Sequence, residues 1–328
     1  MAKDFAELKS TRADQFAYLR RVAPVDGSKR TKTVVQQALR ASGDNVLADR
    51  IENCRRGAYC SSIYCKLCRD RYAHALHQRL AVRAEERHHN QHDSVHRTFR
   101  HLTVIFDVVD LRSQEFGAAI AATRGRRAEI AGLTAVKSAL EQARRETKAM
   151  RRRFPQLWMQ GAFEIEVIDT GTLYSMASDT RKARLIRALI ARRQNPEEAA
   201  RTQVIVHCHC AVDVADVDAD EFHHWVHERW SLPHQARLSM TYHPDKQSLE
   251  AKLYKLASYC FKNRLAYNFS DETSGWEDGE RIPYGELADM VRIYERLSGK
   301  GLNGWLLGCK PGSSTNSPLL PVKRHHDA

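Results

Sequence analysis

Apolar and polar positions alternate in three segments of the chain and predict three strands. Residues 99–109 are rich in β-branched and aromatic side chains, residues 161–168 alternate clearly, and residues 203–213 form a third apolar stretch. Side chains two positions apart in a strand share a face, so each segment can turn one side toward a core. A shorter segment, 236–242, predicts a fourth strand.

Apolar residues at helical spacing separate these strands. The spacing predicts short helical patches within 31–50 and further helices at 69–86, within 113–153, and at 181–193, 219–230, 247–263 and 284–297. Strands separated by helices of mixed length indicate an α+β fold with helices packed on a central antiparallel sheet. A parallel α/β fold is the alternative, although the chain has no glycine-rich phosphate loop to support it.

Composition shifts divide the chain into parts. We expect a basic helical region at 1–50, a zinc-binding module with its helix at 51–98, a main domain at 99–268, a C-terminal helical extension at 269–310 and a disordered tail at 311–328. The tail is rich in proline, serine and charge, which is typical of disorder. Residues 171–200 are interpreted as an insertion into the main domain.

The charge of the chain favours a polyanionic partner. Its 328 residues include 52 Lys and Arg against 40 Asp and Glu, a net charge of +12. Such an excess is typical of DNA-binding proteins, although many basic proteins bind no nucleic acid. No long apolar stretch predicts a membrane span or a secretion signal, so we expect a cytoplasmic protein without a membrane partner. The candidate DNA contacts are Arg55, Arg56, Arg69, Arg71, Arg151, Arg152 and Arg153.

Four of the eight cysteines lie close together, at positions 54, 60, 65 and 68. Zinc prefers four soft ligands in a tetrahedron, and a short segment can supply them. The two-residue gap between Cys65 and Cys68 is the usual spacing of half a zinc site. Cys54, Cys60, Cys65 and Cys68 are therefore interpreted as structural zinc ligands, with unpaired buried thiols or a disulfide as the alternatives.

Two histidines in the third strand are the sharpest chemical feature. His207 and His209 share a face because they are two positions apart, and imidazole is a common metal ligand. Cys208 and Cys210 should then point into the core. Two glutamates, Glu164 and Glu166, share a face of the second strand, and we favour Glu166 as the third ligand. Two hydrogen-bonded histidines and a surface carboxylate are the alternative.

A tyrosine and a lysine lie three positions apart in the helix predicted at 247–263, so Tyr259 and Lys262 are neighbours on its surface. A tyrosine phenol has a pKa near 10, and a nearby ammonium group favours the more nucleophilic tyrosinate. Packing in the core for Tyr259 and solvation for Lys262 is the alternative. Tyr254 should face another side of the helix and serve in packing.

Together these motifs resemble those of the replication initiators of small rolling-circle plasmids and phages, which belong to the His-hydrophobic-His (HUH) endonuclease superfamily. The resemblance covers about residues 54–263, and the joint order of the motifs is its most specific feature. The matching segments are the cysteine-rich segment 54–68, the strand 99–104, the Gly-initiated strand 161–167, the histidine motif 207–209 and the Tyr-x-x-Lys motif 259–262.

The resemblance implies an HUH endonuclease-like fold with an RRM-like core, and a single-tyrosine DNA-nicking activity in the bacterial cytoplasm. Tyr259 and Lys262 would be catalytic, and His207, His209 and Glu166 would hold Mg²⁺ or Mn²⁺. The product would be a 5′-phosphotyrosine link with a 3′-hydroxyl that primes replication by host helicase and polymerase. Some relatives carry a glutamate one turn before the tyrosine for a second cleavage, where this chain has Lys255.

Two other functions fit parts of the pattern. A transposase of the same superfamily would use the same tyrosine chemistry, and a second tyrosine on the same helix face would favour it. A zinc-bearing DNA-binding regulator without catalysis explains the charge and the cysteines, but it leaves the histidine pair and the tyrosine motif without a role.

Overall fold

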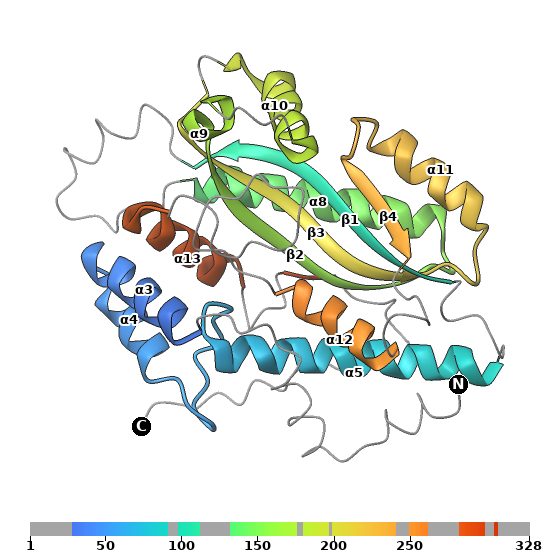
Figure 1. Ribbon diagram of the computed structural model, residues 1–328, viewed down its shortest axis with the longest axis horizontal. Coiled ribbons are helices and arrows are strands. Elements are labelled where there is room, and N and C mark those ends of the chain that lie inside the picture. Colours follow the sequence, from blue (N-terminus) through green and yellow to red (C-terminus); the bar gives the residue numbers. More distant parts are fainter. Residues whose placement is uncertain are drawn as a thin grey trace.

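The structure is a computed structural model, and it describes residues 28–90, 98–111, 132–175, 180–196, 199–240, 249–261, 282–298 and 305–307. Its centre is a five-stranded sheet in the order β4-β1-β3-β2-β5, in which every neighbouring pair is antiparallel (Figure 1). The antiparallel α+β prediction is therefore confirmed, and the parallel alternative is wrong. The strands are β1 (Phe99–Asp110), β2 (Trp158–Asp169), β3 (Thr202–Asp213), β4 (Ala236–Met240) and β5 (Leu306–Leu307).

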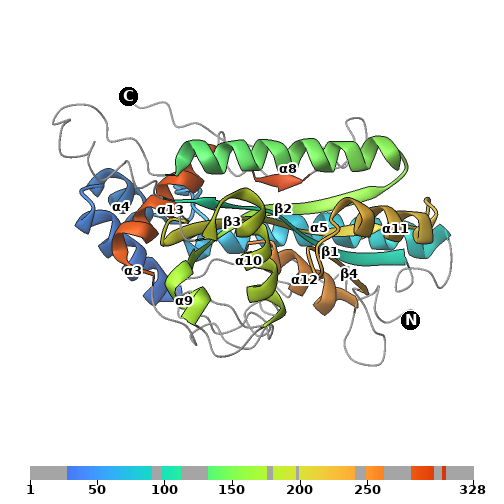
Figure 2. The ribbon, with the colours of Figure 1, turned by 90° about the horizontal axis from the view of Figure 1, so that it is seen from above.

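Helices lie on both faces of this sheet (Figure 2). The longest on one side is α8 (Leu133–Arg153), and on the opposite side lie α12 (Leu249–Tyr259) and α10 (Arg181–Arg193). The remaining helices are α3 (Ser28–Ala41), α4 (Asn45–Glu52), α5 (Lys66–Asn90), α9 (Thr170–Ser175), α11 (Ala219–Arg229) and α13 (Tyr284–Ser298). Among the described helices, none is long and apolar enough to cross a membrane.

The central strand β3 gives the sheet two chemically different faces. Every residue of β3 is buried, and its alternation separates the histidines from the cysteines. We call the side that carries His207 and His209 the His face and the other side the Cys face. Cys208 and Cys210 are buried on the Cys face, as the sequence predicted. Helix α8 covers this face.

The C-terminal part of the chain completes the sheet, which the sequence analysis did not predict. The backbone N–H of Phe163 in β2 donates to the carbonyl of Trp305, at 2.7 Å. Further along the same edge, the N–H of Ile165 donates to the hydroxyl of Tyr294 on α13, at 2.9 Å. An exposed strand edge has unpaired backbone groups. Trp305 and Tyr294 thus accept hydrogen bonds from two backbone N–H groups at the edge of β2.

Helix α13 also packs against the N-terminal helices. Its Arg292 lies 3.1 Å from Asp44, the residue that caps the start of α4, and its Glu295 pairs with Arg50 on α4. The regions that the sequence analysis placed at opposite ends of the chain are thus in contact in the fold (Figure 1).

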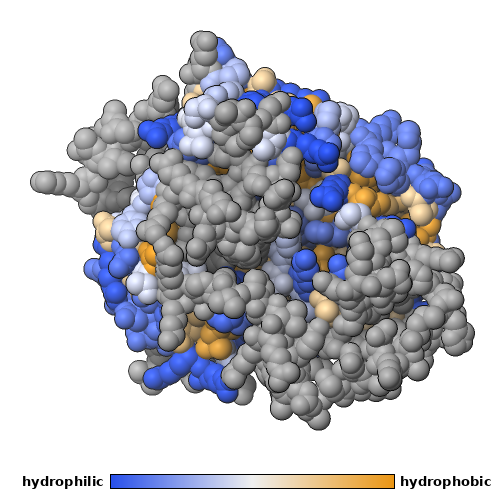
Figure 3. Space-filling model, in the orientation of Figure 1, coloured by the Kyte–Doolittle hydropathy of each residue, from blue (hydrophilic) through white to orange (hydrophobic). Residues whose placement is uncertain are grey.

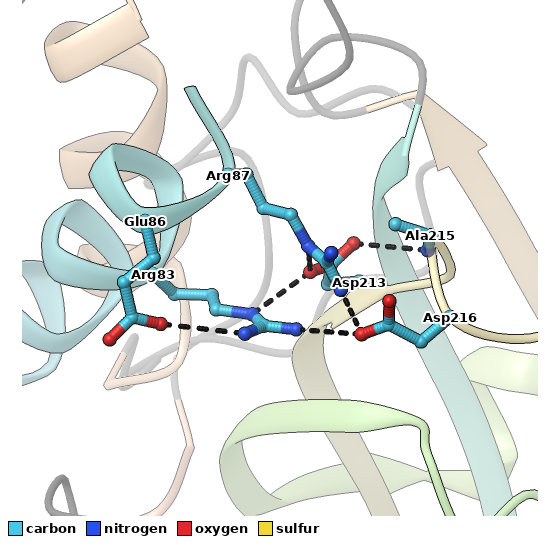
Figure 4. A network of polar contacts seen from close by, with 6 residues as sticks. All are labelled: Arg83, Glu86, Arg87, Asp213, Ala215 and Asp216. Carbon is cyan, nitrogen blue, oxygen red and sulfur yellow. Dashed lines mark hydrogen bonds and ion pairs between the residues drawn. The ribbon is translucent and has the colours of Figure 1, made fainter. Parts of the chain in front are cut away.

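A buried ion-pair network fixes α5 to the sheet. Arg83 and Arg87 both donate to the carboxylate of Asp213 at the end of β3, at 2.9 and 2.6 Å (Figure 4). They also pair with Asp216 in the following turn. The Asp213 side chain has no exposed surface, and a buried carboxylate is tolerated only when it is paired and hydrogen-bonded. The network therefore sets where the second half of α5 lies.

Helix α5 in turn carries α12. The ring of Tyr72 lies 5.9 Å from that of Phe261, and the ring of His77 lies 5.8 Å from that of Tyr254. Three buried residues of α12, Leu253, Leu256 and Ala257, belong to the same hydrophobic core. The position of α12 over the His face thus depends on α5.

Candidate metal centres and active site

Three buried side chains with metal-ligand chemistry meet on the His face. In the antiparallel register Glu164 of β2 lies directly opposite His207 of β3. Oε2 of Glu164 is 3.4 Å from Nε2 of His207 and 3.6 Å from Nε2 of His209. The three ligand atoms lie within 4.8 Å of one another, so they can bind one ion. We call this group the Glu-His-His cluster.

The third member of this cluster is Glu164, where the sequence analysis favoured Glu166. Glu166 lies opposite Ile205, two cross-strand pairs further along β2, and its carboxylate is 2.7 Å from Nζ of Lys182 on α10. Both glutamates share the His face, as alternation requires. Only the pairing register decides which of them reaches the imidazoles, and a single strand does not contain that information.

The chemistry of the Glu-His-His cluster fits a divalent cation. Nε2 of His207 is buried without a hydrogen-bond partner, which is costly unless something else satisfies it. The hydroxyl of Thr103 lies 3.0 Å from Nδ1 of His209. When Nδ1 donates to this hydroxyl, Nε2 keeps its lone pair toward Glu164, as in many metal-binding histidines. Two imidazoles and a carboxylate are suitable ligands for Mn²⁺ and related ions.

Tyr259 stands over this cluster. Its ring is edge-on to that of His209, with centroids 4.8 Å apart, and edge-on to that of His101 at 5.8 Å. The thiol of the next residue, Cys260, donates to the backbone carbonyl of His209 at 3.2 Å, which attaches α12 to β3 at this point. The phenol is half-buried. This tyrosine and the histidine pair, which belong to separate elements, are therefore neighbours in the fold.

The other predicted residues of α12 have different surroundings. Tyr254 is buried against α5, and its burial raises its pKa to about 12, so its predicted packing role is confirmed. Lys255 is exposed. Lys262, the predicted partner of Tyr259, lies outside the described residues.

Two residues beside the cluster were not predicted as functional. His101 is half-buried and packs against both His209 and Tyr259, and the partial removal of its ring from water together with the charge of Arg237 lowers its pKa to about 4. Its imidazole is therefore neutral near pH 7. Arg237 is exposed on β4 directly opposite Thr103, so it also lies on the His face. The sequence did contain a signal for His101, because His101 and Thr103 are two positions apart in one strand and therefore share a face.

The four cysteines form a second group, which we call the four-cysteine cluster. Their sulfur atoms lie within 4.8 Å of one another, with Cys68 at 3.5 Å from Cys54 and 3.6 Å from Cys60. A tetrahedral zinc site with Zn–S bonds of ~2.3 Å places its sulfurs about 3.8 Å apart. The disulfide alternative is wrong, because these cysteines are free.

Local hydrogen bonds suit thiolates in the four-cysteine cluster. Backbone N–H groups of Cys60 and Ser61 donate to the sulfurs of Cys54 and Cys68, at 3.3 and 3.2 Å. The thiol of Cys60 donates to Cys54 and lowers its pKa to about 7, while the same interaction raises the pKa of Cys60. The bare thiols must share protons because neighbouring thiolates repel each other. A bound dication removes that repulsion.

No family model, curated protein or solved structure matches this chain. Functional inference therefore depends on the geometry of its own residues.

The candidate DNA contacts divide into three groups. Arg55 and Arg56 are exposed beside the four-cysteine cluster, and Arg71 is half-buried there. Arg69 is only 9% exposed, so it does not belong to an accessible basic surface. The third group, Arg151, Arg152 and Arg153, ends α8 on the far side of the sheet from the Glu-His-His cluster, and Arg153 pairs with Glu221.

A different basic element shares the His face. Helix α10 contains six Lys and Arg residues and no acidic residue, and its Lys182 reaches Glu166. Figure 2 shows α10 and α12 on the same side of the sheet, opposite α8. The surface nearest the Glu-His-His cluster thus differs from the one that the sequence analysis favoured. A local run of arginines in the sequence carries no information about the face of the sheet on which it will lie.

Proposed function

We propose that this protein is a metal-dependent nicking enzyme that cuts one DNA strand at an origin and starts rolling-circle replication. The observation that carries the proposal is the contact between Tyr259 and the Glu-His-His cluster. A nucleophile, two imidazoles and a carboxylate from separate elements converge at one place. The net charge of +12 suits a DNA substrate.

Glu164, His207 and His209 would hold the catalytic ion, Mg²⁺ or Mn²⁺. When bound, the ion polarises the scissile phosphate and stabilises negative charge that develops on its oxygens. Two imidazole ligands favour Mn²⁺ over Mg²⁺. The buried, unpartnered Nε2 of His207 supports this assignment.

Tyr259 would be the attacking group. Its phenol gives up a proton and its oxygen forms a bond to phosphorus, while the bond from phosphorus to the 3′ oxygen breaks. The released oxygen takes up a proton, which leaves a 3′-hydroxyl and a 5′-phosphotyrosine link. Lys262 is proposed to neutralise charge beside the phenol. The neutral imidazole of His101 packs beside the ring and limits its movement.

The four-cysteine cluster is proposed to hold a structural zinc ion. It includes Cys68 in the first turn of α5, on which α12 packs, so the metal would maintain the position of Tyr259 without taking part in the chemistry. The 3′-hydroxyl would prime synthesis by a host polymerase, with a host helicase unwinding the duplex. The buried position of Tyr254 on α12 does not favour a transposase that uses two tyrosines.

The test is the covalent adduct. Single-stranded oligonucleotides of random sequence, labelled at the 3′ end, are incubated with the protein and Mn²⁺ and resolved on a denaturing protein gel. The label should migrate with the wild-type protein and with Tyr254→Phe, a matched tyrosine on the same helix. Tyr259→Phe should bind the DNA but form no adduct.

Two results would contradict the proposal. An adduct in Tyr259→Phe would show that another residue is the nucleophile. DNA binding without an adduct in the wild-type protein, with any oligonucleotide, would favour the zinc-bearing regulator.

A further inference from the structure

The loop between the first two cysteines is a tight hairpin on the surface. Arg55 and Ala58 exchange backbone hydrogen bonds of 3.2 and 3.1 Å. Gly57 has a φ of +93°, as the third position of a type II turn requires, and a side chain there would be strained. Because Cys54 and Cys60 lie on either side, the four-cysteine cluster fixes both ends of this turn.

An aromatic side chain follows the turn and remains exposed. Tyr59 is 37% exposed, one of only a few large hydrophobic side chains on the described surface, which is mainly hydrophilic in the view of Figure 3. The guanidinium of Arg71, from the second turn of α5, lies 4.2 Å from the centroid of its ring. A cation over an aromatic face is attractive, so this ring is held in place at the surface.

The positive charge around the ring is not neutralised within the described part of the protein. Arg55, Arg56 and Arg71 form no ion pair with a described residue, whereas the neighbouring Lys66 pairs with Asp70 at 2.9 Å. On an ordinary solvated surface the ring would have no role. Here, however, arginines without an ion-pair partner among the described residues lie next to an exposed aromatic ring. Stacking and phosphate contact are the two interactions by which proteins bind single-stranded nucleic acid.

We propose that Tyr59 is a stacking site for a base of the single-stranded DNA substrate, with Arg55 and Arg56 contacting the adjoining phosphates and Arg71 orienting the ring. The inference rests on the proposed function, because it takes the strand to be nicked as the ligand. An intact duplex does not fit, since the faces of its bases are already stacked on one another. Because the four-cysteine cluster fixes both ends of this hairpin, little conformational entropy is lost on binding.

The experiment measures affinity by fluorescence anisotropy with a labelled oligothymidylate. Tyr59→Leu keeps an apolar side chain but removes the aromatic face, and it should weaken binding about 10-fold. Tyr59→Trp should bind at least as tightly as the wild type. Tyr284→Leu, at another exposed tyrosine, on α13, should leave affinity unchanged. The zinc content of each variant shows whether the four-cysteine cluster is intact.

The arginines are tested by the salt dependence of the same affinity. Replacing Arg55 and Arg56 by Gln should reduce the slope of log affinity against log salt by about 1.4, since each lost phosphate contact on a single strand contributes ~0.7. Tyr59→Leu should leave the slope unchanged. A loss of slope in Tyr59→Leu would contradict a stacking role.

Other outcomes separate this inference from the proposed function. If Tyr59→Leu binds as tightly as the wild type while the adduct still forms, the stacking site is overturned and the nicking activity stands. If Tyr59→Leu binds single strands more weakly although no variant forms an adduct, the stacking site stands and the nicking activity is overturned. An equal loss of affinity for a hairpin duplex would also overturn stacking.

Discussion

The phenol ring of Tyr259 stands edge-on to the imidazole of His209, with ring centroids 4.8 Å apart. One residue belongs to α12 and the other to β3, so their contact depends on how a helix is placed over the sheet. That placement is set by α5, whose first turn contributes Cys68 to the four-cysteine cluster and whose second half Asp213 anchors through Arg83 and Arg87. The contact between Tyr259 and His209 therefore depends on the residues that hold α5 in place.

The first prediction separates the two glutamates of β2. Glu164→Gln removes a charged ligand from the Glu-His-His cluster, so Mn²⁺ affinity measured by calorimetry should fall by at least about 10-fold. Glu166→Gln, the matched control on the same face, loses its ion pair with Lys182 and should keep Mn²⁺ affinity. A larger loss in Glu166→Gln than in Glu164→Gln would restore the assignment made from sequence.

The second prediction concerns the hydroxyl beside His209. Thr103→Val removes the hydrogen bond to Nδ1 and frees the imidazole to change tautomer and orientation. Mn²⁺ affinity should fall about 10- to 100-fold, as for other residues that orient metal-binding histidines. Thr103→Ser keeps the hydroxyl and should recover most of the affinity. Unchanged affinity in the valine variant would mean that packing alone orients the ring.

A third prediction addresses the four-cysteine cluster. The purified protein should contain one zinc ion per chain by elemental analysis, and Cys65→Ala should lose it. Because the cluster holds the first turn of α5 through Cys68, the same variant should unfold at a lower temperature and form less adduct. Cys208→Ala, at a buried cysteine of the Cys face, should keep its zinc despite a cavity in the core. Zinc retained in Cys65→Ala would contradict the assignment.

The acid stability of the protein should depend on Asp216. The hydrogen bond from Arg87 lowers the pKa of this carboxyl below its ordinary value. A group whose pKa is lowered on folding stabilises the protein above its unfolded pKa, about 3.9, and this contribution is lost as pH falls through the folded value. The difference in unfolding free energy between the wild type and Asp216→Asn should therefore be largest above about pH 4 and shrink below it.

Denaturant titrations at a series of pH values measure that difference. Asp220→Asn is the control, because Asp220 is exposed at the start of α11 and forms no ion pair with a described residue. A pH-independent difference for Asp216→Asn would show that the ion pair with Arg87 does not contribute in solution.

The periodicity of the sequence predicted most of the secondary structure. The predicted helix at 181–193 coincides with α10, and the predicted strand at 203–213 differs from β3 by one residue. Local signals suffice here because alternation and helical spacing are properties of a single segment. The side of β3 on which Cys208 and Cys210 lie followed from the same alternation.

Features that depend on pairs of segments were predicted less well. Glu166 was preferred over Glu164 because the register between β2 and β3 is absent from either strand alone. The arginines that end α8 were chosen by their density, although α8 lies on the face opposite the Glu-His-His cluster. Strand β5 was missed because two residues are too short for a periodic signal.

The amino-acid sequence by itself determined which side chains could serve as a nucleophile or as metal ligands, and which face of its own strand or helix each of them occupies. That information is local, since it follows from the chemistry of side chains and the geometry of one segment. Tertiary structure alone decided which carboxylate joins the two imidazoles, that Tyr259 packs on His209, and which basic side chains share their side of the sheet. Register and helix placement are set by burial and pairing across the whole core, which no single segment contains.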